Sequence, residues 1–306
     1  MDKFKSIVVG LDFSECSAVA MKQAMRVAKA SGAQVHPIHV LDTHVVTELE
    51  SAINAFQHGL RDQLRDDARS RYAEFAKNIP GAEKLELDVE VDALIRGLLR
   101  TAARHKPDLF VIGAYGRRKA DVGMGTVATG CVRKAMAPVL VVRDTQTGPF
   151  RNIIACVDFS DTSQRALETA AQFAKCDGSD LHLLHLFDAP WNDFHYRSPT
   201  PEANPDFKRQ YRGTLEAHLK NFGKDALAGI PSGKVHFHLV DEPSHREGIV
   251  EFVRKLQGDL VVVGTRGKSN LRDVLLGSTA EKVLSRSPCS VLAVKPEGFE
   301  HPFSKA

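Results

Sequence analysis

An internal repeat constrains the fold of this chain more than any other feature of its sequence. Three segments of the first half return in the second half in the same order: 7–17 as 153–163, 107–113 as 258–264, and 138–142 as 291–294. Solenoid repeats recur roughly every 20–50 residues, whereas one copy here takes up half of a chain of 306 residues. The repeat therefore predicts two duplicated domains, expected over 1–147 and 148–306, each long enough to bury a core of its own.

Within each copy, short apolar runs alternate with longer amphipathic stretches, as strands alternate with helices. This predicts an α/β fold in which helices cover both faces of a mostly parallel sheet. The expected strands are 5–11, 34–41, 84–91, 108–113 and 138–143, then 151–157, 180–187, 234–241, 259–264 and 289–295. The expected helices are 15–31, 47–78, 93–105 and 126–136, then 161–176, 204–228, 244–257 and 278–286. Ser14 and Ser160 stand at N-cap positions, and Gly32 and Gly178 at C-terminal stops.

Charge and cysteine content narrow the classes of function. The formal net charge of +3 does not call for a nucleic-acid partner. The five cysteines include no Cys-x-x-Cys pair, and their odd number favours reduced thiols in a cytosol over a disulfide framework. The N-terminus lacks the apolar core of a signal peptide, and no run is long enough to cross a bilayer. We therefore expect a cytoplasmic protein that neither inserts into a membrane nor binds nucleic acid.

A glycine-rich loop follows the fourth expected strand of the second copy. Gly264-Thr265-Arg266-Gly267 is separated by nine residues from Gly277-Ser278-Thr279, which open the next helix. Glycines let the backbone turn sharply and approach a ligand closely, and the free N–H groups and dipole of a helix start suit phosphate. The spacing predicts an adenine-nucleotide site, and a glycine-rich surface loop is the alternative.

A carboxylate follows the first expected strand of each copy, at Asp12 and at Asp158. In open parallel sheets, ligands bind beyond the carboxyl ends of the strands, where the strand order reverses. If the first and fourth strands are neighbours, the carboxylate and the glycine loop meet at one crevice.

The histidines raise a second kind of site. His236 and His238 share one face of an expected strand and could ligate zinc with a third group, although a structural role is the alternative. The pairs 36/39 and 182/185 are spaced so that their side chains point to opposite faces of a strand. We therefore assign no metal ligands.

At these residues the chain resembles the universal stress protein family, in its tandem two-domain form, over almost its whole length. Gly264, Gly267, Gly277 and Ser278 match the Gly-x-x-Gly, nine residues, Gly-Ser/Thr motif of the nucleotide-binding members. The resemblance implies two doubly wound domains, each with a five-stranded parallel sheet of strand order 3-2-1-4-5. It also implies that the fifth strands pair across a two-fold axis, so that one chain mimics a dimer.

The resemblance further implies the roles of individual residues. Asp158 would contact the ribose or a phosphate-bound metal, and Val157 and Leu186 would line the adenine pocket; helix capping and ordinary core packing are the alternatives. Arg266 and Lys268 would neutralise phosphate or lie in solvent. The implied site for ATP with Mg²⁺ comprises Val157, Asp158, Leu186, Gly264, Thr265, Arg266, Gly267, Gly277, Ser278 and Thr279.

The first copy departs from the motif. Only eight residues separate Gly116 from Gly125, which we expect to shift the phosphate-binding turn relative to the preceding strand. Proline often stands two residues before the first-strand aspartate in the family, and here Gly10 and Cys156 take that place. We therefore expect a degenerate loop in domain 1 and the better site in domain 2.

These observations predict a stress-response protein that binds ATP or a related adenine nucleotide in domain 2 as a regulatory signal. No strong general base or arginine clamp is evident, so we assign no catalytic residue and expect at most slow hydrolysis or autophosphorylation, with Ser278 the nearest acceptor. The alternative is a non-nucleotide binding or dimerisation module that holds another small metabolite or a lipid-like ligand. The aromatic segment 189–201 is either a lid or partner surface, for a protein or for self-association, or an irregular loop.

Overall fold

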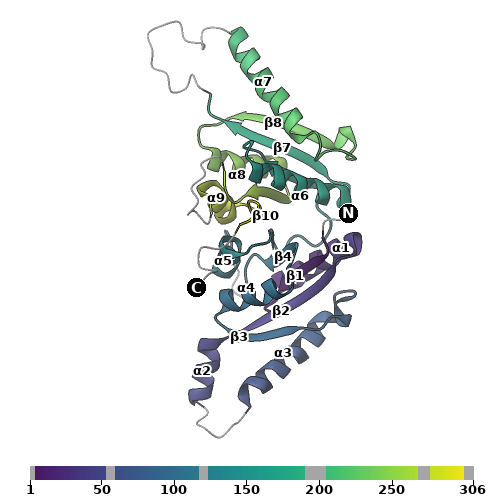
Figure 1. The fold of residues 1–306 in the computed structure, drawn as a ribbon, viewed down its shortest axis with the longest axis vertical. Coiled ribbons are helices and arrows are strands. Elements are labelled where there is room, and N and C mark those ends of the chain that lie inside the picture. Colours follow the sequence, from purple (N-terminus) through teal and green to yellow (C-terminus); the bar gives the residue numbers. More distant parts are fainter. Residues whose placement is uncertain (1–3, 53–58, 117–122, 190–204, 268–275, 300–306) are drawn as a thin grey trace. The chain divides into compact units, whose positions relative to one another are not determined.

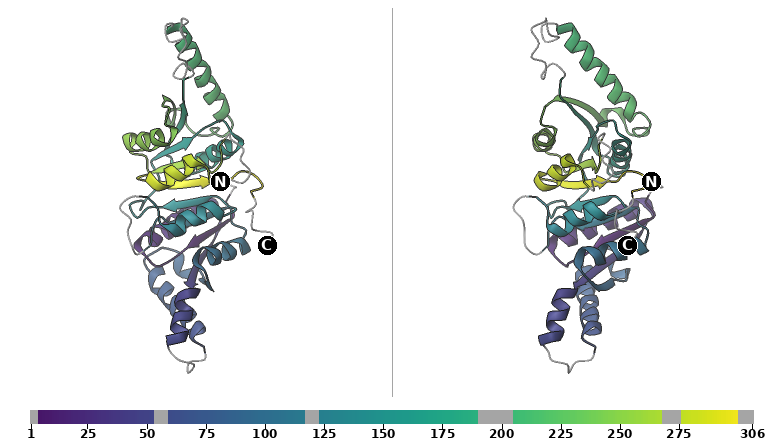
Figure 2. Two further views of the ribbon diagram at one scale, coloured as in Figure 1. Left: turned by 90° about the vertical axis from the view of Figure 1, so that its left-hand side faces the viewer. Right: turned by 60° about the vertical axis from the view of Figure 1, so that its left-hand side comes forward.

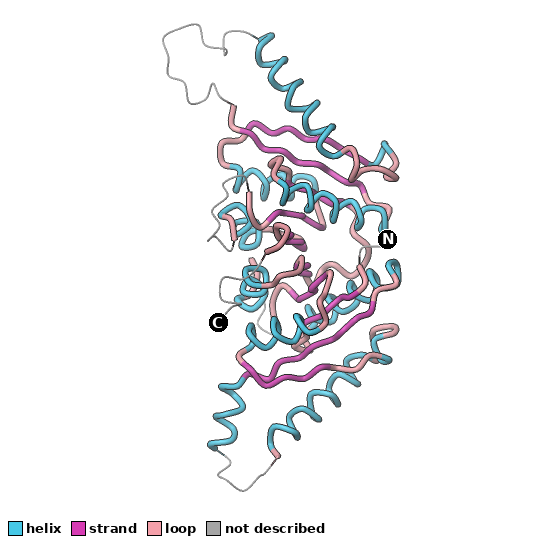
Figure 3. Tube along the Cα trace, viewed as in Figure 1, coloured by secondary structure: helices cyan, strands magenta, loops and turns pink. Residues whose placement is uncertain are grey.

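A computed structural model describes residues 4–52, 59–116, 123–189, 205–267 and 276–299. The chain divides into two compact units, one of residues 1–149 with 299–306 and the other of residues 150–298. Strands and helices alternate along the chain, as expected for an α/β fold (Figures 1 and 3). Each unit is described by itself below.

Unit 1 contains a parallel sheet of strand order β3-β2-β1-β4-β5. Helix α1 packs against β1 and β4, and α4 packs against β2 and β3. The elements are β1 (Ser6–Gly10), α1 (Glu15–Ser31), β2 (Gln34–Asp42), α2 (Thr43–Ala52), α3 (Leu60–Ala76), a 3₁₀ turn (Ala82–Lys84), β3 (Asp88–Asp92), α4 (Leu94–Arg104), β4 (Leu109–Gly113), α5 (Thr126–Lys134) and β5 (Val139–Val142).

Unit 2 repeats this topology with strand order β8-β7-β6-β9-β10, again parallel. Helices lie on both faces of the sheet in each unit (Figure 2). The elements are β6 (Asn152–Cys156), α6 (Asp161–Asp177), β7 (Asp180–Phe187), α7 (Pro205–Gly223), a 3₁₀ turn (Ser232–Lys234), β8 (Val235–Asp241), α8 (His245–Leu256), β9 (Leu260–Gly264), α9 (Ser278–Arg286) and β10 (Ser290–Val294). The α/β class and the strand order 3-2-1-4-5 are confirmed in both units, while pairing of the fifth strands stays a prediction.

Strands β4, β5 and β10 are almost entirely apolar because both of their faces are covered. All five residues of β4 and of β10, and all four of β5, are buried. This is the pattern of parallel strands packed between two layers of helices.

The four predicted caps, at the ends of α1 and α6, are confirmed. The hydroxyls of Ser14 and Ser160 accept hydrogen bonds from the backbone three residues on, and Ser160 forms a full capping box. Gly32 (φ 74°) and Gly178 (φ 64°) end the same two helices in the left-handed conformation.

Two predicted elements of unit 1 are wrong. The helix expected over 47–78 is two helices, α2 and α3, and Gly59 precedes α3 at φ 99°, a conformation that a right-handed helix cannot pass through. The strand expected over 84–91 begins only at Asp88, because Gly81 (φ 86°) starts a 3₁₀ turn before it. Within the described residues, no helix is both long and apolar enough to span a membrane.

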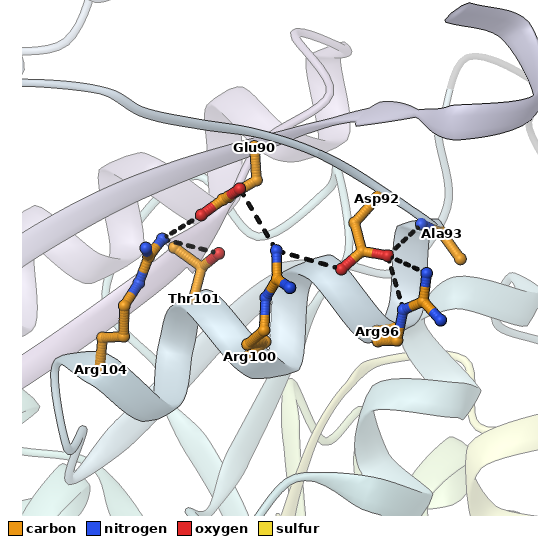
Figure 4. Close-up of polar contacts among 7 residues, drawn as sticks. All are labelled: Glu90, Asp92, Ala93, Arg96, Arg100, Thr101 and Arg104. Carbon is orange, nitrogen blue, oxygen red and sulfur yellow. Dashed lines mark hydrogen bonds and ion pairs between the residues drawn. The ribbon is translucent and has the colours of Figure 1, made fainter. Parts of the chain in front are cut away.

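A row of ion pairs and hydrogen bonds connects side chains of α4 with side chains of β3 (Figure 4). Asp92, whose side chain is 4% exposed, accepts from the Ala93 N–H at 2.8 Å and from Arg96 Nε at 2.6 Å. Arg100 bridges Asp92 Oδ2 (3.3 Å) and Glu90 Oε2 (3.4 Å). The hydrogen bond from Arg96, together with that from Ala93, holds the pKa of Asp92 below its usual range.

We expect Asp92→Asn to lower the free energy of unfolding by about 2 kcal/mol, since the buried carboxylate loses the negative charge that pairs with Arg96 and Arg100. Urea denaturation at pH 7 measures this loss. The control is Asp66→Asn, which breaks the exposed Asp66–Arg69 pair and should change little. Because the pKa of Asp92 is depressed, its contribution persists above the unfolded pKa and disappears as the pH falls through the folded value. An equal effect of both variants would contradict the buried role of Asp92.

Candidate functional site

The first and fourth strands of each copy are neighbours, as predicted. In unit 2, β6 pairs in parallel with β9, with Ile153 opposite Leu260. In unit 1, β1 pairs with β4 in the corresponding register, with Ile7 opposite Leu109. The aspartate and the glycine loop therefore leave the sheet at adjacent carboxyl ends.

Asp158 and Gly267 meet directly at this edge. A Cβ added to Gly267 would lie 2.7 Å from Asp158 Oδ2, so a side chain there would displace the carboxylate. The corresponding distance in unit 1, from Gly116 to Asp12 Oδ2, is 2.6 Å. In both copies, glycine therefore allows the carboxylate to approach the loop backbone without having to shift.

The two oxygens of the Asp158 carboxylate have different surroundings. Oδ1 accepts from the Ser160 backbone N–H at 3.0 Å and from the Ser160 hydroxyl at 2.5 Å. Oδ2 is the oxygen that faces the glycine loop. Oδ1 therefore supports the N-cap residue Ser160, whereas Oδ2 faces Gly267, and its contact with a ligand stays a prediction.

The glycine loop is closed by a backbone bond at the start of α9. The Thr265 N–H donates to Val294 O at 2.8 Å, and the Gly277 N–H donates back to Thr265 O at 2.8 Å. Gly277 is the N-cap residue, and Ser278 and Thr279 begin the helix. The geometry of an α-helix leaves the N–H groups of these first two residues without an acceptor inside the helix.

Three further groups surround the loop. Thr265 is fully buried, and among the described residues its hydroxyl oxygen has no hydrogen-bond partner. Lys295, directly after β10, is 2% exposed. Burial, and to a smaller extent the charge of Arg266, lowers the pKa of Lys295 to about 7. An anion beside the loop would relieve this electrostatic cost.

The sequence patterns did not single out Lys295, although a signal existed. A basic residue follows the last strand of each copy, Arg143 in unit 1 and Lys295 in unit 2. Arg143 Nη2 donates to the carbonyl of Gly123, within the glycine loop of unit 1, at 3.1 Å. The first residue after the fifth strand is thus placed at the loop in both copies.

The two residues expected to line an adenine pocket are both buried. Val157 is 4% exposed and Leu186 is 7% exposed. Leu186 packs against α8, since a Cβ on Gly248 would lie 2.5 Å from Leu186 Cδ2. This contact fits the core alternative for Leu186, and its role at a ligand stays a prediction.

The shorter loop of the first copy does not displace the start of its helix. The Gly125 N–H donates to Ala114 O at 2.7 Å, which matches the bond between Gly277 and Thr265. The expected shift is therefore absent at the helix start, because the closing bond fixes that end of the loop. The described residues do not include 117–122, 190–204 or 268–275, and Lys268 lies in the last of these ranges.

His236 and His238, the two histidines considered as zinc ligands, have different hydrogen-bond partners. His236 Nε2 is 2.9 Å from Asp180 Oδ1, and His238 Nε2 is 3.0 Å from His182 Nδ1, so both nitrogens already have partners. Within the part of the chain that the structure describes, no group of three or more His, Cys, Asp or Glu side chains is placed to hold a metal ion.

Comparison with known proteins settles the family. The model of the universal stress protein family matches residues 3–143 and again residues 149–295. The chain belongs to the universal stress protein family. A full-length relative, a universal stress protein of Mycobacterium bovis, is 26% identical over 94% of each chain. A universal stress protein of Methanocaldococcus jannaschii is 30% identical and aligns with 48% of this chain and 82% of its own length.

Solved structures of the family share the tandem fold. The crystal structure of a universal stress protein from Archaeoglobus fulgidus superposes with a TM-score of 0.63 at 18% identity. It covers 95% of this chain and 98% of its own. At this identity the likeness concerns the fold alone.

Proposed function

We propose that this universal stress protein is a cytoplasmic stress-response protein that binds ATP or a related adenine nucleotide in domain 2 as a regulatory signal. The observation that carries the proposal is the approach of Asp158 Oδ2 to Gly267, beside a loop that ends on the N-terminus of α9. A carboxylate acceptor, a glycine backbone without a side chain and the N-terminus of a helix thus lie together at one edge of the sheet. These are groups that a nucleotide-binding site uses.

The residues present fit the chemistry of a nucleotide with Mg²⁺. The N–H groups of Ser278 and Thr279 and the dipole of α9 suit phosphate oxygens. Arg266 would supply positive charge beside the loop, and a bound phosphate would favour the protonated form of the buried Lys295. Asp158 Oδ2 would accept from a ribose hydroxyl or ligate Mg²⁺, which prefers carboxylate oxygen. The buried hydroxyl of Thr265 is a further polar group for this loop.

Binding would act as a signal by favouring one arrangement of the loop between Gly267 and Gly277. A ligand shifts a conformational equilibrium only through its different affinity for the two states. The proposal includes at most slow hydrolysis or phosphorylation of Ser278, as the sequence predicts.

The test is a calorimetric titration of the purified, nucleotide-stripped chain with Mg-ATP. We expect one site per chain, since only domain 2 carries the full motif. Absence of heat at millimolar ATP would overturn the proposal and favour the non-nucleotide module, and two equal sites would contradict the assignment to domain 2.

A further inference from the structure

The residue after Asp158 has an unfavourable backbone conformation. Phe159 lies at φ 61°, in the left-handed region that bulky residues rarely adopt. Phe13, after Asp12 in unit 1, has the same φ of 61°. Strain of this kind persists only where surrounding contacts fix the backbone, and it is concentrated at functional sites.

His185, on the neighbouring strand β7, supplies such contacts on both sides of Asp158. Its Nδ1 lies 2.7 Å from Val157 O, and because a carbonyl can only accept, Nδ1 carries the proton. The imidazole ring also packs on the Phe159 ring, with 4.4 Å between centroids. His185 is 9% exposed, so this bond is shielded from water.

Helix α7 also contacts this turn. The His218 ring stacks on Phe159 with 4.1 Å between centroids and 9° between planes, and Phe222 meets it edge-on at 5.4 Å. Phe159 is therefore held by rings from two elements. The backbone on either side of Asp158 has little freedom to move.

Unit 1 contains the same arrangement from the equivalent residues. His39 Nδ1 lies 2.8 Å from Leu11 O, and the His39 ring packs on Phe13 at 4.7 Å. The duplicate offers an internal control, since a change at His39 disturbs the equivalent contact in unit 1, away from the proposed nucleotide.

We propose that His185 is a positioning residue for the nucleotide site: by holding Val157 O and the Phe159 ring, it directs Asp158 Oδ2 at the ligand beside Gly267. The inference rests on the proposed function. A small rotation of this turn would move Oδ2 relative to the loop, and an acceptor must meet its donor at about 2.7–3.2 Å. His185 acts through Asp158 and does not itself touch the ligand.

The experiment compares the Mg-ATP dissociation constants of His185→Leu and His185→Asn by calorimetry. Leucine fills the buried position but removes the N–H donor. We expect the dissociation constant for Mg-ATP to rise about tenfold, the lower end of the loss of affinity that follows when a residue orienting a binding side chain is changed. Asparagine places its amide N–H where His185 has Nδ1, so we expect affinity within about threefold of the parent chain, a difference well under the 1.4 kcal/mol of a tenfold change. If the leucine variant does not fold, His185→Gln, whose donor lies one bond farther out, takes its place.

His39→Leu separates positioning from general stability. We expect it to lower the melting temperature about as much as His185→Leu does while leaving the Mg-ATP affinity unchanged. Unchanged affinity in His185→Leu, or equal weakening in His39→Leu, would overturn the inference and leave the proposed function intact. Failure of the parent chain itself to bind Mg-ATP would remove both.

Discussion

Gly277→Asp is expected to weaken Mg-ATP binding about 100-fold while leaving the fold of domain 2 intact. Gly277 has φ −65° and ψ 149°, which any residue adopts, and an added Cβ would make an ordinary contact 3.4 Å from Thr265 O. Aspartate is also a favoured N-cap residue. Its carboxylate would stand where we place the phosphates, and repulsion of about 3 kcal/mol corresponds to that loss of affinity.

The matched control is Gly125→Asp in domain 1. Gly125 is the N-cap of α5, with φ −64° and ψ 160° and a Cβ position 3.4 Å from Ala114 O, so the structural change is the same. Calorimetric titration of both variants should show loss of binding in one and parent-like binding in the other. Parent-like affinity in Gly277→Asp would show that the phosphates do not lie at α9.

The parts of the site that can be predicted are those that depend on residues close together in the sequence. The loop motif at 264–279, the N-caps and the strand-end aspartate are local patterns, and the structure places the motif where neighbouring strands end. The separate start of α3 was not predicted because the sequence on either side of Gly59 has helical periodicity, and this one glycine decides where α3 begins.

The parts that could not be predicted depend on side chains that meet across the sheet. His185 is 28 residues from Val157, whose carbonyl it binds. The partner of His182 is His238, 56 residues away on β8. Spacing along one strand tells which face a histidine occupies, but not which ring it meets there.

That histidine cluster leads to the second large effect, a loss of domain 2 stability on acidification. His182 is 6% exposed, stacks on His236 with 4.6 Å between centroids, and has its Nδ1 3.0 Å from His238 Nε2. Phe252 of α8 covers His238, and Asp180 holds His236. Burial first, and then the charges of His236 and His238 against the weaker pull of Asp180, lower the pKa of His182 to about 4.

The direction of the pH dependence follows from the depressed pKa. The pKa of His182 is about 6.5 in the unfolded chain and about 4 in the folded chain, so between these two pH values the unfolded chain binds the proton more tightly. The free energy of unfolding is therefore highest above pH 6.5 and falls as the pH drops towards 4. Each unit of depression corresponds to about 1.4 kcal/mol, which gives a loss of about 3 kcal/mol from this one ring. Burial also lowers the pKa of His238, in the same direction.

Urea denaturation of the domain 2 transition between pH 7.5 and pH 4 measures this effect. We expect His182→Leu to make the free energy of unfolding depend less on pH, because the buried ring that resists protonation is gone. The variant should also be less stable at every pH, since His238 Nε2 loses its hydrogen-bond partner. His245→Gln, which changes an exposed histidine of α8, should keep the parent profile. A parent-like profile in His182→Leu would show that the acid sensitivity lies elsewhere. His238, whose pKa burial lowers in the same direction, would then be the next residue to change.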